Sequence, residues 1–76
     1  MTVTAKVMVM IAVHNNDAYT VESNGMITIY APDELYALRL SYQLSNPWSD
    51  IYKGFADADK EAALRELDGK VKIVIR

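Results

Sequence analysis

An apolar run near the start of the chain, from Val7 to Val13, constrains the fold more than any other segment. Valine or isoleucine occupies every second position in it, and β-branched residues favour strands. Side chains that alternate at this period point to opposite faces of a sheet. The sequence therefore predicts a strand over about residues 3–13, whose inward side chains are Val7, Val9, Ile11 and Val13.

The opposite face of this predicted strand is also apolar at its middle. Met8 and Met10 would lie there, with Lys6 at one end. Lys72 and Val74 of the last predicted strand would lie on the same outer side of the sheet. Contiguous exposed apolar patches usually mark contact sites, and methionine is common where a surface adapts to a partner. These five residues predict a partner-binding surface with an apolar centre and a basic rim.

Two further strands are predicted over residues 18–22 and 26–30, which flank an Asn-Gly pair. A two-residue turn would place Val21 opposite Thr28, so that apolar side chains face polar ones. A three-residue loop that ends in a left-handed glycine would instead place Val21 opposite Ile27. Because the second register pairs apolar side chains with each other, the sequence favours the three-residue loop.

Two helices are predicted between the hairpin and the last strand. Pro32 at the first turn, followed by two acidic residues, indicates a helix over about residues 31–45. A second helix is predicted over about residues 57–67, and Gly69 stands at the usual left-handed position after it. The chain then ends in strict alternation over residues 70–76, which predicts a strand.

These elements predict a single α+β domain over residues 1–76, with the element order ββ β αα β. The predicted sheet has four antiparallel strands in the order 3-2-1-4, and the two helices pack on one face. The third and last strands would be edges, open to strand addition by another chain. The first helix would face the sheet with Leu35, Leu38 and Tyr42, and this stripe is widened by Ala37, Leu40 and Leu44.

Composition limits the classes of function. Hydrophobic residues make up 51% of the 76 residues and cysteine is absent, which indicates a globular domain without disulfides or thiolate metal sites. The chain is compatible with a reducing compartment, and we expect a cytoplasmic location. A net charge of −2 disfavours nucleic acid as a partner. The apolar run is too short to cross a membrane, so we expect no membrane insertion.

No motif indicates catalysis. The one histidine, His14, follows a predicted strand and lies among turn residues, without a nucleophile pattern near it. The acidic segment that begins at Asp57 resembles a calcium loop only in its first positions, because Ala62 replaces the glycine that the sharp turn requires. We therefore predict no enzyme, no cofactor and no metal site.

Aromatic residues are the remaining candidates for binding. Trp48 and Tyr52 lie in the connection between the two predicted helices, and both residue types anchor protein interfaces. Small domains also bury aromatic residues to enlarge the core. The sequence leaves both interpretations open, including one in which the Trp48 segment covers the helix and sheet core.

The resulting functional hypothesis is a small stand-alone interaction protein that docks on a larger protein and inhibits or modulates it. Small α+β proteins of this type are common in phage and mobile elements, for example as inhibitors of CRISPR enzymes, and the analogy rests on size and on the absence of catalytic motifs. The alternative is a homodimer assembled through the outer sheet face or an edge strand. A small enzyme or a metal-binding protein is a third, less favoured class.

Overall fold

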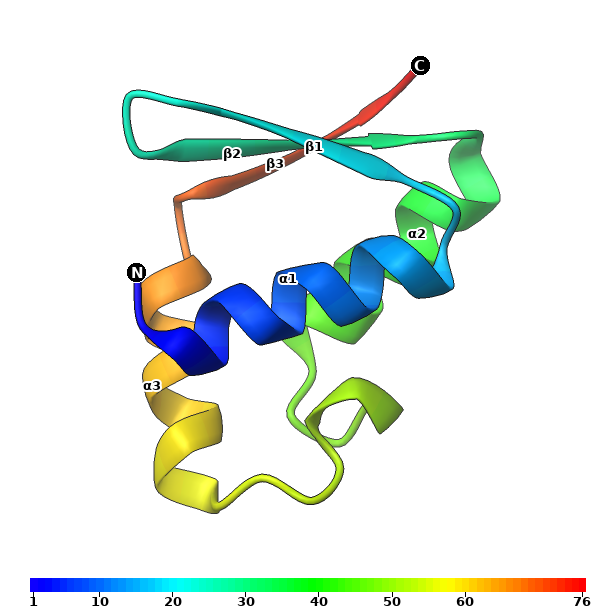
Figure 1. Cartoon of the computed structure of the whole chain (residues 1–76). Coiled ribbons are helices and arrows are strands. Elements are labelled where there is room, and N and C mark those ends of the chain that lie inside the picture. Colours follow the sequence, from blue (N-terminus) through cyan, green and yellow to red (C-terminus); the bar gives the residue numbers. More distant parts are fainter.

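A computed structural model describes all residues 1–76. Three helices lie on one side of a three-stranded sheet, and the other face of the sheet has no helix on it (Figure 1). The elements are α1 (Val3–Asn15), β1 (Tyr19–Ser23), β2 (Met26–Ala31), α2 (Glu34–Ser45), the short 3-10 helix η1 (Asp50–Tyr52), α3 (Asp57–Leu67) and β3 (Val71–Ile75). The chain is therefore an α+β domain, but the predicted four-stranded antiparallel sheet with two helices is wrong.

The largest correction concerns the N-terminal segment, which is the helix α1 and not a strand. The hydroxyl of Thr2 accepts a hydrogen bond from the backbone N–H of Ala5 at 3.2 Å and caps the first turn. The buried side chains of α1 are Ala5, Met8, Val9 and Ala12. Their spacing of three, four and seven residues is that of one helical face. Apolar side chains surround α1 on nearly all sides, so alternation alone could not distinguish it from a strand.

The hairpin between β1 and β2 has the two-residue turn that the sequence argument rejected. Asn24 and Gly25 have φ angles of 53° and 79°, which is the backbone of a turn whose twist matches the strands. Val21 therefore lies opposite Thr28. The three-residue loop was favoured in order to pair apolar side chains. Val21 is half exposed, however, so its face of the sheet does not require such pairing.

β3 lies at an edge of the sheet, but its neighbour is β2, and the two strands run parallel. The predicted neighbour, the N-terminal segment, is helical and cannot join a sheet. Val71 pairs with Ile27 and Ile73 pairs with Ile29, so the alternating side chains of both strands point toward the helices. The connection from β2 to β3 contains α2, η1 and α3.

The helices α2 and α3 match their predicted ranges closely, but α2 buries only part of the predicted apolar face. The carboxylate of Asp33 accepts the backbone N–H of Tyr36 at 3.0 Å and sets the start of α2. Leu40 and Leu44 are buried against the other elements. The stripe predicted to face the sheet, formed by Leu35, Leu38 and Tyr42, is instead 56–70% exposed.

The segment after α2 turns back to satisfy the last carbonyl groups of this helix. The hydroxyl of Ser49 donates to the carbonyl of Gln43 at 2.7 Å, and the phenol of Tyr52 donates to the carbonyl of Leu44 at 2.8 Å. Both donors are buried. These side chains therefore supply partners that a helix end lacks, and they fix η1 against the end of α2. None of the helices has the length and apolar character needed to cross a membrane.

Candidate functional site

The free edge of β3 carries unpaired backbone groups. In the ladder with β2, the carbonyl of Lys70 accepts from Ile27 at 2.8 Å and the N–H of Arg76 donates to Ala31 at 2.9 Å. A strand in a parallel pair directs the backbone groups of alternate residues to the same neighbour. The residues between these two contacts therefore divide into two sets, and the set that points away from β2 is Val71, Ile73 and Ile75.

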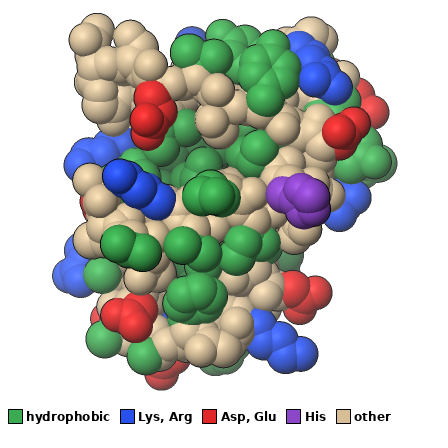
Figure 2. Space-filling view, in the orientation of Figure 1, with side chains coloured by type: hydrophobic (Ala, Val, Ile, Leu, Met, Phe, Trp, Pro, Cys, Tyr) green, Lys and Arg blue, Asp and Glu red, His purple; other side chains and the backbone are tan.

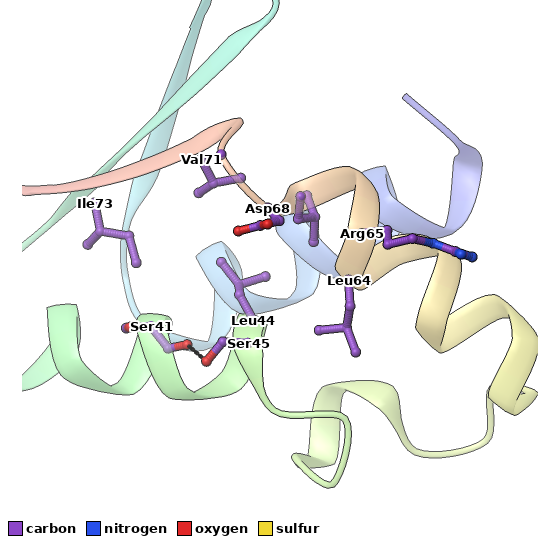
Figure 3. A pocket seen from close by; sticks show the side chains of 10 residues that line it. Ser41, Leu44, Ser45, Leu64, Arg65, Asp68, Val71 and Ile73 are labelled. Carbon is purple, nitrogen blue, oxygen red and sulfur yellow. Dashed lines mark hydrogen bonds between the residues drawn. The ribbon is translucent and has the colours of Figure 1, made fainter.

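A groove runs beside this free edge, between β3 and α2. Its two adjoining hollows enclose about 500 Å³ and about 490 Å³, and both are lined by Ser41, Val71 and Ile73. Val71 and Ile73 point from β3 toward α2, while Leu44 and Leu64 approach from α2 and α3 (Figure 3). The residues with free backbone groups therefore also form the apolar wall of the groove.

The outer rim of the groove is an exposed apolar ridge on α2. Leu38 lines the hollow near Ile75 and is 70% exposed. Leu35 and Tyr42 lie three positions before and four positions after it, on the same face of the helix. Soluble domains expose single apolar residues routinely, but an apolar stripe that continues from an apolar groove indicates a contact surface. We call the groove and this ridge together the α2–β3 surface.

Polar side chains also line the groove, namely Glu34, Ser41, Ser45, Arg65 and Asp68. The hydroxyl of Ser45 donates to the carbonyl of Ser41 at 2.6 Å, so this hydroxyl hydrogen is used within α2 (Figure 3). Arg65 and Asp68 border the end of the groove near Val71. This arrangement provides an open groove with apolar and polar side chains in its lining and with backbone donors and acceptors of β3 along one wall.

The open face of the sheet is a second exposed surface. The rings of Tyr19 and Tyr30 stack with their centroids 5.0 Å apart, and the guanidinium of Arg76 lies 5.6 Å from the Tyr19 ring centroid. Lys72 and Val74 lie on this same face by register. Of the predicted outer surface, this pair remains together. The two methionines predicted to join them lie on α1, on the other side of the sheet.

The structure separates the remaining predicted contact residues. Met8 and Tyr52 are fully buried, so neither side chain lies on an exposed surface. Lys6 and Met10 line a shallow hollow between α1 and β1, where Met10 is 69% exposed. Figure 2 shows hydrophobic side chains gathered across the face that α1 occupies in Figure 1. The predicted single surface is therefore distributed over two sides of the molecule.

Trp48 is the most exposed large apolar side chain, at 86%. Its backbone N–H donates to the side-chain carbonyl of Asn46 at 2.8 Å, which fixes the turn but leaves the indole free. The connection between α2 and α3 lies on the side of the helices away from the sheet (Figure 1). Trp48 does not cover the core, and it does not line the α2–β3 groove.

The titratable groups form no cluster that could hold a metal ion. No group of three or more His, Asp or Glu side chains comes close enough together to hold a metal ion. The acidic segment forms the first turns of α3, where Asp57 pairs with Lys60 at 3.8 Å. Burial raises the pKa of the Tyr52 phenol, and hydrogen bonds from Thr2 lower the pKa of the Glu66 carboxyl. Both groups with a shifted pKa connect structural elements, because Tyr52 bonds to the end of α2 and Glu66 bonds to the residue that caps α1.

The α2–β3 surface could have been found in part from the sequence. The alternation of Val71, Ile73 and Ile75 in an edge strand was visible, as was the apolar stripe on α2. The stripe on α2 was instead predicted to face the sheet, and the edge of β3 was considered only as a site of strand addition. Comparison of the chain with protein-family models, curated proteins and solved structures gives no match, so the site rests on its own geometry.

Proposed function

We propose that this chain is a protein-interaction module that binds an extended segment of a larger protein along the free edge of β3. The observation that carries the proposal is the coincidence of two features in the same three residues. Val71, Ile73 and Ile75 present free backbone donors and acceptors, and their side chains line the apolar groove. Strand addition uses this combination, because backbone hydrogen bonds give affinity and side-chain pockets give selectivity.

A bound segment would lie between β3 and α2. Its backbone would continue the sheet, and every second side chain would enter the groove between β3 and α2. Each apolar side chain that becomes fully buried there would contribute about 1.5–3 kcal/mol before the cost of ordering the segment is subtracted. The ridge of Leu35, Leu38 and Tyr42 would meet the body of the partner beside the segment.

The biological role that we propose is inhibition or modulation of the partner, without catalysis by this chain. A segment held as an added strand is unavailable for its other contacts, which is a direct physical route to inhibition. The phage or mobile-element type and a cytoplasmic location belong to this proposal as expectations from size and composition. Trp48 would be a separate anchor if the partner extends around the helices.

Nuclear magnetic resonance tests the proposal directly. Phage-displayed random peptides would be selected against the chain, and a selected peptide would be titrated into the isotope-labelled protein. We expect the largest shifts at the amides of Val71, Ile73 and Ile75. A peptide methylated on alternate backbone nitrogens should lose binding, since it cannot pair with the edge. Shifts confined to α1 or to the Trp48 connection would contradict the proposal.

Three substitutions separate binding in the groove from non-specific hydrophobic binding. Leu38→Glu should weaken peptide binding about tenfold or more, because it places a charge at the groove rim. Met10→Glu is the matched control, since Met10 is also helical and is 69% exposed, against 70% for Leu38. Ser41→Tyr should block the groove without changing β3. Equal losses for Leu38→Glu and Met10→Glu would show that neither effect is specific to the groove.

A further inference from the structure

The charge of the β3 edge defines the chemistry of its partner strand. Lys70 precedes β3, Lys72 lies within it and Arg76 follows it, and β3 contains no acidic residue. Register places the side chains of Lys72 and Val74 on the open face of the sheet. Lys72 is exposed, and no ion pair involves it. The edge therefore presents unpaired positive charge on one face and apolar side chains on the other.

The open face of the sheet offers no internal partner for this charge. The side chains of β1, β2 and β3 that point to this face include no acidic residue. Glu22 of β1 lies opposite Ile27, so it belongs to the face that the helices cover. Arg76 extends toward β1, where its guanidinium lies over the ring of Tyr19. Lys72 is thus the cation that remains beside the free edge.

From this pattern we infer that the segment bound by β3 alternates apolar residues, which enter the groove, with acidic residues, which lie beside Lys72 on the open face. The inference rests on the proposed function, since it assumes that β3 accepts a strand. Cross-strand pairs of opposite charge stabilise a sheet, whereas like charges directly opposite each other destabilise it. A strand with glutamate or aspartate at its outer positions therefore fits this edge, and a basic strand does not.

The same charges disfavour a second copy of this chain as the occupant. An antiparallel pair of β3 strands centred on Ile73 would place Lys70 opposite Arg76. A pair centred on Lys72 would place this residue opposite its own copy, and a pair centred on Val74 would place Lys72 opposite Arg76. Every one of these two-fold registers sets like charges directly opposite each other. Lysine on an edge strand is a common means of preventing self-association.

Three peptides of one design test the inference. Each has the length of β3 with a serine added at both ends, and valine alternates with glutamate, glutamine or lysine. Their affinities would be measured from the amide shifts of Val71, Ile73 and Ile75. We expect the glutamate peptide to bind about five- to tenfold more tightly than the lysine peptide, with the glutamine peptide between them. The preference should decrease at high salt, because screening weakens exposed charge pairs.

A charge reversal makes the test specific to one residue. Lys72→Glu should exchange the preference, so that the lysine peptide binds more tightly than the glutamate peptide. Lys53→Glu is the matched control, because it changes the net charge equally at an exposed position after η1. Equal affinity of the unsubstituted chain for all three peptides would overturn the inference while leaving the proposed function in place. Binding of none of them at β3 would overturn both.

Discussion

Removing one oxygen atom from the chain should measure how strongly the end of α2 depends on its cap. Tyr52 is fully buried, and its phenol donates to the carbonyl of Leu44 at 2.8 Å. In Tyr52→Phe the ring remains and the donor is lost. The hydrogen bond contributes about 1 kcal/mol, and the buried carbonyl that loses its partner adds a desolvation cost. We expect the free energy of unfolding to fall by about 1–2 kcal/mol.

Urea unfolding followed by far-ultraviolet circular dichroism would measure this change. Tryptophan fluorescence is a poor probe, since Trp48 is already 86% exposed in the folded chain. In a thermal scan the same loss corresponds to a decrease of about 5–15 °C in Tm for a domain of this size. Tyr42→Phe is the control, because Tyr42 is 56% exposed and donates no hydrogen bond within the chain. A loss below about 0.5 kcal/mol for Tyr52→Phe would refute the reasoning.

The same phenol makes stability depend on alkaline pH. Burial raises the pKa of Tyr52 in the folded chain above its value in the unfolded chain, which is about 10. Between these two pKa values the unfolded chain releases the proton while the folded chain retains it. Stability should therefore be unaffected below pH 10 by this group and should decline as the pH rises toward the folded pKa. Tyr52→Phe should remove this part of the decline.

Three other outcomes follow from the structure. Met8→Lys should unfold the chain, since it places a charge at a fully buried position. Met10→Lys should change the free energy of unfolding by less than about 0.5 kcal/mol, because Met10 is exposed, and circular dichroism distinguishes the two outcomes. Gly25→Ala should cost about 1 kcal/mol in urea unfolding, because Gly25 has a φ of 79°, a backbone conformation that is strained for an L side chain, although an added Cβ would meet no atom within 4 Å. Glu66→Gln should lower Tm at neutral pH but not at low pH. The lowered pKa of Glu66 gives a contribution that is present above the unfolded pKa and disappears as the pH falls through the folded one.

The sequence predicted local elements where capping and turn residues define them. The left-handed Gly69 after a helix that ends at Leu67 was predicted correctly. The Asn-Gly turn was recognised, but its register was decided by pairing Val21 with Ile27, whereas the fold exposes Val21 and buries Ile27. At this turn the local preference of an Asn-Gly pair was therefore a better guide than an assumption about burial.

The N-terminal segment could not be assigned from its own residues. Val7, Val9 and Ile11 alternate as in a strand, whereas Ala5, Met8, Val9 and Ala12 are spaced as in a helix. Both patterns are present, and packing against the other helices and the sheet selects the second. This one error also displaced the predicted binding surface. The predicted sheet placed this segment between β1 and β3, whereas β3 pairs with β2. The exposed stripe on α2 was predicted to face the sheet.

The parallel pairing of β2 with β3 has a consequence for the kinetics of folding. The β1–β2 hairpin closes over two residues, but β3 can join β2 only after the chain has passed through α2, η1 and α3. Closing such a long loop costs entropy, and contacts between distant residues form slowly. We therefore expect the β3 edge to be assembled late. A partner that binds this edge would stabilise the completed fold and slow its opening, so that occupancy and lifetime of the native state would rise together.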